Sequence, residues 1–239
     1  MTTLDYSAFD ALTFDCYGTL IDWETGILAA LRPTLAAHGV TPPEDELLEA
    51  FGRAEATAEA GLYRPYREVL ANCLREIGQG YGIEPGDDAA RTFGSSVAEW
   101  PVFPDSAAAL HRLRTRFRLG VITNCDTDLF AASNARLGVE FDWVVTAQSV
   151  GSYKPDPRNF EAAFDAIARA GIARQRILHV AQSLFHDHVP AKRFGLSTVW
   201  IDRRQGRAGA GATPPASATP DAAFPDMTSF AAAATREAQ

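Results

Sequence analysis

Five short apolar runs along the chain predict buried β-strands. The first, residues 11–15, ends in Asp15, which predicts a strand that presents a carboxylate at its C-terminal end. The other four runs have a similar length and composition, and they span residues 119–123, 142–146, 177–181 and 197–201.

Segments with helical periodicity lie between the later runs. Asp105 is an N-cap candidate before a helical pattern, and further patterns cover residues 126–137, 157–170 and 187–194. A regular alternation of strand and helix is typical of a parallel sheet with helices on both faces. We therefore predict an α/β fold whose core is a doubly wound, Rossmann-like parallel sheet.

Residues 23–100 have a different character, because they are rich in Ala, Leu and Glu and show no strand pattern. Leucines recur there at helical spacing, and Pro33 predicts a kink or a break in the first helix. We therefore predict a core of residues 1–22 and 101–239 and an inserted helical domain of residues 23–100. Such an insertion is well placed over the C-terminal ends of the strands, where ligands bind in doubly wound folds.

The C-terminal part begins with a segment of low complexity. Residues 205–223 are rich in Gly, Ala, Pro, Thr and Ser, which predicts a mobile surface loop. A final helix is expected from about residue 226.

Charge and composition exclude several classes of partner. The net charge is −8 and the pI about 5.1, which argues against nucleic acid and anionic membranes as partners. No apolar run approaches the roughly 20 residues that span a bilayer, and residues 1–10 lack the features of a signal peptide. The three cysteines are odd in number and lack metal-binding spacing. We therefore expect a cytoplasmic protein with reduced thiols.

Polar side chains follow four of the predicted strands where each strand ends. Asp15 is followed by Thr19, Asn124 closes the second run, and Lys154 and Asp187 lie in the loops after the third and fourth runs. Taken singly, Asp15 is better explained as a turn cap and Lys154 as a solvated lysine. Because the ends of parallel strands share one edge of the sheet, we expect these side chains to meet.

In this order, the polar stretches resemble the four motifs of the haloacid dehalogenase superfamily. The matching stretches are Asp15 to Thr19, Thr123 with Asn124, Lys154 with Pro155, and Val180 to Asp187. The resemblance covers nearly the whole chain. It implies that residues 23–100 form a cap domain and that Asp15 is the nucleophile of a hydrolase.

Two departures from the phosphatases of that superfamily concern the acid and the metal. Tyr17 stands where those enzymes carry a second Asp as general acid, and a phenol with a pKa near 10 is a poor acid at neutral pH. Gln182 replaces an acid of their fourth motif, and magnesium prefers carboxylate oxygens. A halide leaving group requires neither a proton nor a metal. We therefore predict no cofactor and no metal.

The Asp-x-Tyr-Gly-Thr pattern also resembles the type II 2-haloacid dehalogenases. That resemblance implies that Asp15 displaces halide from a haloacetate or an (S)-2-haloacid and that water hydrolyses the resulting ester. The partner is then a small carboxylate. The alternative is a magnesium-dependent phosphatase acting on a small phosphate ester. A ring-opening hydrolase and a non-enzymatic binding module also remain.

The expected roles follow from side-chain chemistry and the resemblance. Lys154 keeps Asp15 ionised, and Asp187 orients Lys154 or activates water. His186 is a second base candidate, although it is equally well explained as a loop histidine. Arg53 is the nearest of three candidates for a cap arginine that binds substrate. The remaining substrate-binding candidates are Tyr17, Thr19, Thr123, Asn124, Ser183 and Phe185. The resemblance also implies a homodimer.

Overall fold

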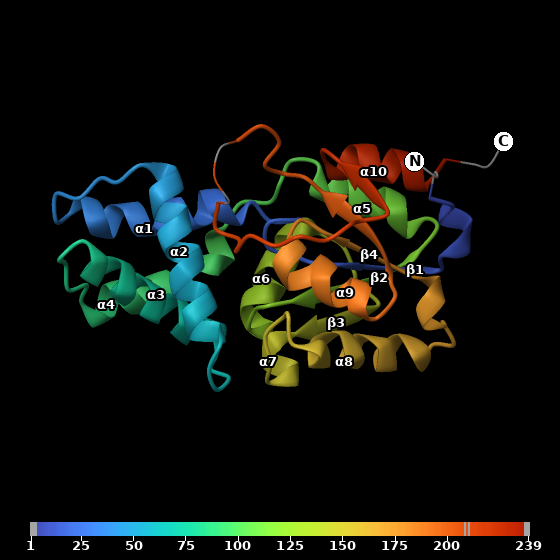
Figure 1. Ribbon diagram of the computed structural model, residues 1–239, viewed down its shortest axis with the longest axis horizontal. Helices are drawn as coiled ribbons and strands as arrows, with labels where there is room; N and C mark the ends of the chain where they lie inside the picture. Colours follow the sequence, from blue (N-terminus) through green and yellow to red (C-terminus); the bar gives the residue numbers. More distant parts are fainter. Residues whose placement is uncertain (1–3, 208, 210, 237–239) are drawn as a thin grey trace.

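The computed structural model describes residues 4–207, 209 and 211–236 of the chain. Its centre is a sheet of six parallel strands in the order β3-β2-β1-β4-β5-β6 (Figure 1). The strands are β1 (Ala11–Phe14), β2 (Arg118–Thr123), β3 (Trp143–Thr146), β4 (Ile177–Ala181), β5 (Ser197–Ile201) and β6 (Ala222–Phe224). This confirms the predicted fold class.

The central strand β1 is buried along its whole length because it pairs on both sides. Phe14 lies opposite Val121 of β2 and opposite Val180 of β4. Uninterrupted apolar runs are typical of such doubly covered strands. The chain moves from β1 to β2 and β3 on one side, and then returns to place β4 on the other. This reversal creates a crevice at the C-terminal end of β1.

Helices cover both faces of the sheet (Figure 1). On one face, α5 (Ser106–Arg114), α6 (Thr127–Leu137) and α10 (Met227–Ala234) contribute to the larger apolar cluster. On the other, α8 (Pro157–Ala168) and α9 (Val189–Arg193) pack around Phe160 and Ile122 in a second cluster. The short helix α7 (Ala147–Val150) follows β3. Residues 187–194 were expected to form one helix, but Leu184–His188 form a π-helical turn that precedes α9.

The part of the chain between the β1 turn and α5, residues 23–99, forms a group of helices that lies beside the sheet (Figure 1). It contains α1 (Trp23–Ala36), α2 (Glu44–Glu59), α3 (Tyr66–Gly80), α4 (Asp87–Ser95) and a 3₁₀ turn (Ser96–Glu99). Phe51 of α2 makes edge-to-face contacts with Trp23 and Phe93, which join α1, α2 and α4. Helix α1 continues through Pro33 without the break that was one of the expectations, and it ends three residues later.

The chain enters and leaves this helical insertion at two neighbouring points next to the sheet. Ile21 and Val102 form an antiparallel bridge, and the backbone N–H of Asp22 donates a 2.7 Å hydrogen bond to the carbonyl of Pro101. The outgoing and returning chains are therefore held together directly after the β1 turn.

The segment after β5 differs from the mobile surface loop that its composition predicts. Ala212 is fully buried against the insertion, and its backbone N–H donates a 3.1 Å hydrogen bond to Glu24 of α1. Arg204 forms an ion pair with the same carboxylate at 2.5 Å. Strand β6 begins at Ala222, within the last two residues of the range for which only a loop was expected. The other described residues of 205–221 form no helix or strand and are at least partly exposed, as predicted for a surface loop, apart from Gly211 and Ala212.

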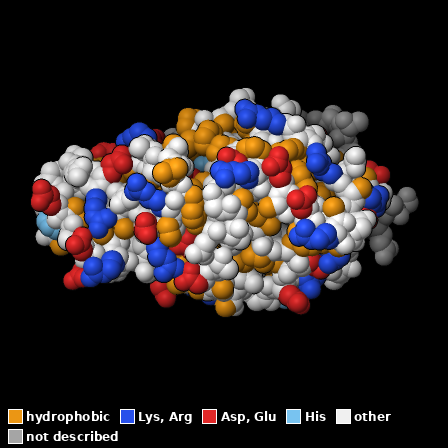
Figure 2. Space-filling model, turned by 90° about the horizontal axis from the view of Figure 1, so that it is seen from below, with side chains coloured by type: hydrophobic (Ala, Val, Ile, Leu, Met, Phe, Trp, Pro, Cys, Tyr) orange, Lys and Arg blue, Asp and Glu red, His pale blue; other side chains and the backbone are white. Residues whose placement is uncertain are grey.

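The surface shows no concentration of one charge on the face seen in Figure 2. Basic and acidic side chains are intermixed there across the insertion and the sheet region. None of the helices in the described part of the chain is long and apolar enough to cross a membrane.

Candidate active site

Asp15 follows β1 directly, in the turn that leaves the sheet. The residue is 6% exposed, and its Oδ2 accepts a 2.7 Å hydrogen bond from the hydroxyl of Thr19. The same hydroxyl oxygen accepts the backbone N–H of Gln182 at 2.9 Å. Gly18 has a φ of 93°, which glycine adopts without the strain of a side chain. The turn therefore fixes one carboxylate oxygen and leaves the other to face Lys154.

The Lys154 ammonium lies between two carboxylates, and the residue is only 1% exposed. Its Nζ donates to Asp15 Oδ1 at 2.9 Å, to Asp187 Oδ1 at 2.7 Å and to the carbonyl of Ile122 at 2.8 Å. An ammonium group has three donors, so all of them are used. The lysine is thus held in one position at the ends of β1, β2 and β4.

The backbone of Lys154 is held by Asn124, which follows β2. The side-chain Oδ1 of Asn124 accepts the N–H of Lys154 at 2.7 Å, and its Nδ2 donates to the Lys154 carbonyl at 3.0 Å. This pair of hydrogen bonds replaces the sheet ladder beyond the ends of the strands. These hydrogen bonds explain why Asn124 and Lys154, from the second and third polar stretches of the sequence, lie together.

Asp187 completes a buried network that continues into the sheet. Its Oδ1 lies 3.0 Å from Nε2 of His179, whose Nδ1 lies 2.9 Å from the Thr13 hydroxyl. Burial alone would raise the pKa of Asp187, but Lys154 and His179 hold that pKa well below its ordinary value. Asp187 is therefore ionised at neutral pH.

The pKa values of Asp15 and Lys154 are shifted by the same network. Burial raises the pKa of Asp15, against the opposing effect of the Lys154 ammonium. Burial by itself would lower the pKa of Lys154, but Asp15 and Asp187 raise it above its ordinary value. Lys154 therefore remains charged, and it is the group that favours the ionised form of Asp15.

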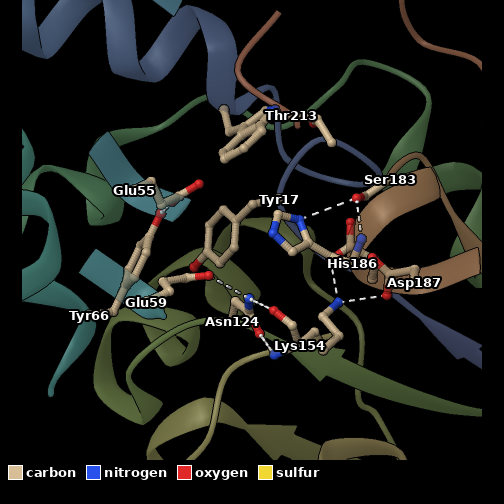
Figure 3. A pocket seen from close by; sticks show the side chains of 12 residues that line it. Tyr17, Glu55, Glu59, Tyr66, Asn124, Lys154, Ser183, His186, Asp187 and Thr213 are labelled. Carbon is tan, nitrogen blue, oxygen red and sulfur yellow. Dashed lines mark hydrogen bonds and ion pairs between the residues drawn. The ribbon is translucent and has the colours of Figure 1, made fainter. Parts of the chain in front are cut away.

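His186 lies in the π-helical turn after β4, a type of turn frequent at functional sites. The Ser183 hydroxyl accepts the backbone N–H of His186 at 2.9 Å and lies 3.2 Å from its Nδ1. Burial lowers the pKa of His186 to about 4, so the ring is neutral at pH 7. Nδ1 faces the Ser183 hydroxyl, and Figure 3 shows the other ring nitrogen, Nε2, facing the interior.

These side chains line one small cavity, in which the centre of a water molecule can occupy about 30 Å³ (Figure 3). Seven of the sequence-predicted site residues meet there, and Thr19 lies behind Asp15 through its hydrogen bond. The seven are Asp15, Tyr17, Asn124, Lys154, Ser183, His186 and Asp187.

Three other predicted residues are not brought to this cavity. Thr123 is buried in β2, and its hydroxyl has no hydrogen-bond partner among the described residues. Phe185 lines an adjoining cavity that shares Lys154 and His186 with the first. Arg53 is exposed and lines a separate groove beside Thr213. The arginine prediction failed because α2 turns a different face to the sheet.

The other cap arginines that the resemblance suggested also lie elsewhere. Arg67 forms ion pairs with Asp126 and Asp128 of the sheet region, and Arg64 is exposed. Among the described residues, the Lys154 ammonium is therefore the cation that lines the cavity.

The cavity contains residues that the sequence analysis did not identify. Glu55 and Glu59 of α2, Tyr66 of α3 and Thr213 all line it. A signal for the glutamates was present, since Glu55 continues the apolar face formed by Leu48 and Phe51 at helical spacing, and Glu59 follows four residues later. An acid in such a stripe is either paired or functional.

The donor set does not fit the magnesium site of the superfamily phosphatases. The carboxylates of Asp15 and Asp187 share the Lys154 ammonium, and Gln182 Oε1 accepts the Thr213 hydroxyl at 3.3 Å. No group of three or more His, Cys, Asp or Glu side chains in residues 4–207, 209 and 211–236 is arranged to hold a metal ion.

Comparison with known proteins agrees with this geometry. A model of the haloacid dehalogenase-like hydrolases matches residues 9–185. The chain belongs to this family. The hydrolase is 27% identical over 203 residues to haloacetate dehalogenase H-2 of Moraxella sp. (strain B), across 81% of this chain and 86% of that one. It is 25% identical over 204 residues to (S)-2-haloacid dehalogenase H-109 of Pseudomonas putida, across 82% and 86%.

The fold of the hydrolase is also found among solved structures. The L-2-haloacid dehalogenase from Xanthobacter autotrophicus with chloropropionic acid covalently bound is similar to this chain with a TM-score of 0.76 and 19% identity. The similarity covers 93% of this chain and 97% of that one, so it includes the helical insertion as well as the sheet.

Proposed function

We propose that this hydrolase removes the halogen from a small 2-haloalkanoic acid, a haloacetate or an (S)-2-haloacid, and releases the 2-hydroxy acid. The observation that carries the proposal is the buried triad of Asp15, Lys154 and Asp187 at the edge of the sheet. The similar enzymes of Moraxella and Pseudomonas are a haloacetate dehalogenase and an (S)-2-haloacid dehalogenase, and this supports the choice of substrate class.

In the first step, a carboxylate oxygen of Asp15 attacks the carbon that bears the halogen. A C–O bond forms, and the halide leaves with the electrons of the C–X bond, so no proton is needed. Lys154 favours the ionised nucleophile, and the Thr19 hydrogen bond limits its rotation. The product of this step is an ester on Asp15.

In the second step, water attacks the carboxyl carbon of Asp15 and loses a proton to Asp187. The bond from that carbon to the substrate oxygen breaks, the leaving alkoxide takes the proton from Asp187 to become the hydroxy acid, and the remaining proton of the water leaves Asp15 to the solvent. The Lys154 ammonium offsets the charge that develops on the carboxyl oxygen. Asp187 Oδ2 is buried and has no hydrogen-bond partner among the described residues, so it is the acceptor available for a proton from that water. In the proposed complex, the neutral His186 ring carries its proton on Nε2 and donates that N–H to the substrate carboxylate.

The helical insertion has a place in this proposal. Residues 23–100 act as a cap domain over a core of residues 1–22 and 101–239, since Glu55, Glu59 and Tyr66 complete the wall opposite Asp15. Enclosure of this kind excludes water during the first step.

The geometry does not favour a phosphatase. The Tyr17 hydroxyl, at the position of the phosphatase general acid, lies 3.0 Å from the Ser133 hydroxyl and accepts the Cys125 thiol at 3.4 Å. Burial raises the pKa of Tyr17 well above its ordinary value, which makes it a poor proton donor at neutral pH.

The test measures chloride and phosphate release side by side, with and without EDTA. Chloride is expected from chloroacetate and (S)-2-chloropropionate, and it should persist in EDTA. Asp15→Asn should lower kcat by about a thousandfold or more, because the nucleophile is removed. Asp10→Asn is the matched control, since Asp10 pairs with Arg176 outside the cavity.

Two results would contradict the proposal. Unchanged chloride release by Asp15→Asn would exclude Asp15 as the nucleophile. Phosphate release that EDTA abolishes, without any chloride release, would support the phosphatase instead.

We further propose that the protein is a cytoplasmic homodimer. All three cysteines are buried and unpaired, as expected for a reduced compartment. Light scattering of the purified protein tests the dimer, and a monomeric mass would contradict it.

A further inference from the structure

Helix α2 contributes two acids to the wall that faces Asp15. Glu55 and Glu59 are four residues apart, so they lie on one face of the helix, and both line the cavity. Figure 3 shows them opposite Ser183 and His186, with the Tyr17 ring between the two walls and the Lys154 ammonium beside Asp187. The cavity therefore has an acidic wall on α2 that faces a wall containing Ser183 and His186.

The acidic wall lacks a cation of its own. Glu55 is 4% exposed, and one of its oxygens accepts the Tyr66 hydroxyl at 2.6 Å. Its second oxygen makes no hydrogen bond to the described residues and points into the cavity (Figure 3). Glu59 accepts the Asn124 amide at 3.2 Å. No Lys or Arg of residues 4–207, 209 and 211–236 pairs with either acid, and the donors of Lys154 are all used.

Carboxyl groups in such a place are costly to ionise without a partner. Burial raises the pKa of Glu55 to about 7, and burial together with Glu55 raises that of Glu59 well above its ordinary value. A cation that entered the cavity would favour the ionised forms of both. An alkyl group there would not change the ionisation of either glutamate.

We propose that Glu55 and Glu59 bind an ammonium group of the substrate, so that the preferred substrate is a small haloacid that also carries an amine. The ammonium lies against α2, and the carboxylate lies toward the opposite wall with His186. The two glutamates are thus specificity residues, whereas Asp15 and Lys154 serve the reaction. The inference rests on the proposed function in one respect, namely that the substrate carries a halogen and a carboxylate.

The first experiment measures binding without turnover. β-Alanine and butanoate have the same number of heavy atoms and differ by an ammonium in place of a methyl group. Isothermal titration calorimetry should show β-alanine binding about tenfold more tightly or better, as charged hydrogen bonds allow. Glu55→Gln and Glu59→Gln should each reduce that preference. Glu49→Gln, a control on the same helix outside this cavity, should keep it.

A second readout is the proton balance of binding. Because an ammonium favours the ionised glutamates, β-alanine should release protons at pH 7, and the binding enthalpy should depend on the buffer. Glu55→Gln should reduce this dependence. Equal affinity for β-alanine and butanoate, or a preference that survives in both Gln variants, would overturn the inference.

Turnover separates this inference from the proposed function. Chloride release is compared between 2-chloro-3-aminopropanoate and 2-chlorobutanoate, and the amine is expected to have the higher kcat/KM. If 2-chlorobutanoate is the better substrate, the inference is wrong and the dehalogenase stands. If neither releases chloride while β-alanine retains its preference, the acidic wall binds amines and the proposed function is wrong.

Discussion

At the scale of single residues, the least replaceable side chain is the Lys154 ammonium between two buried carboxylates. Lys154→Met should lower the free energy of unfolding by about 3–5 kcal/mol, because it leaves Asp15 and Asp187 without their cation. Urea unfolding at pH 7 measures this. Lys192→Met is the control, since Lys192 and Asp221 form a partly exposed pair whose loss should cost less than about 1 kcal/mol. Equal losses in the two variants would contradict a buried triad.

Glu55 should make stability depend on pH in a direction opposite to that of most acids. Its pKa rises from 4.5 to about 7 on folding, so it contributes stability below pH 4.5 that is lost as the pH rises through 7. Glu55→Gln resembles the protonated form. The variant should match the wild type near pH 4.5 and exceed its free energy of unfolding by up to about 3 kcal/mol at pH 8.

The measurement is chemical unfolding of both proteins from pH 4.5 to pH 8. Taking the difference between the two cancels the titration of other groups, including His186. Glu49→Gln should show no such pH dependence. A difference that is constant with pH would mean that Glu55 is ionised in the folded protein.

Residue-level reasoning from sequence found Asp15, Lys154 and Asp187, because the ends of parallel strands meet whatever the loops between them do. It did not find Glu55. The reason is that the residues of α2 that line the cavity depend on how the helix is rotated about its axis, which the sequence does not give. Successive residues are about 100° apart, so Arg53 and Glu55 point in nearly opposite directions. Choosing Arg53 by resemblance placed a cation where the structure has an acid.

At the scale of elements, the N-terminus of α3 is capped by a residue from another part of the chain. Pro65, at the N-cap position, offers no side-chain hydrogen bond. The buried Asp126 instead accepts the backbone N–H of Tyr66 at 2.8 Å and of Arg67 at 3.2 Å. The insertion is thus fastened to the start of α6 by a helix cap.

Asp126→Ala should therefore affect both stability and substrate affinity. A lost cap costs about 0.5–2 kcal/mol, and loosening α3 also displaces Tyr66 from the cavity wall, so KM should rise. Asp156→Ala is the control, because Asp156 caps its own helix α8. That variant should lose similar stability by thermal unfolding and leave KM unchanged. A rise in KM in both variants would argue against a specific fastening role.

The ends of elements were the least predictable part of the fold. Asp105 was expected to cap α5, yet its side chain makes no cap hydrogen bond there and accepts Arg203 and the N–H of Met227 instead. Strand centres were predicted well because burial on both faces demands apolar side chains. The hydrogen-bond partner of a capping side chain can be a residue distant in the sequence. The local spacing of residues does not predict which one it is.

At the scale of the whole molecule, the segment after β5 closes the space between the sheet and the insertion. A Cβ atom at Gly52 of α2 would lie 2.5 Å from the carbonyl oxygen of Ala212. Gly52→Ala should thus destabilise the protein by about 1–3 kcal/mol through overpacking, although alanine in a helix normally stabilises by about 1 kcal/mol. It should also raise KM, since Thr213 follows directly.

The control for this substitution is Gly80→Ala at the end of α3. Gly80 has open space at its Cβ position, so that variant should be neutral or more stable. Thermal unfolding and KM for the preferred haloacid are compared for the two variants. If Gly52→Ala is stabilising, the chain around Ala212 moves to accommodate the added methyl group and does not close the cavity.

The bridge between Ile21 and Val102 has a consequence for how the enzyme admits substrate and discards product. It holds the outgoing and returning chains together, so both covalent connections between the insertion and the sheet lie beside the turn that carries Asp15. Thr19 and Gln182 hold the Asp15 carboxylate from the sheet side, whereas Glu55 and Glu59 reach the cavity from the insertion. Access and chemical alignment are thus governed by different parts of the chain, so faster exchange of ligand can evolve without loss of nucleophile geometry.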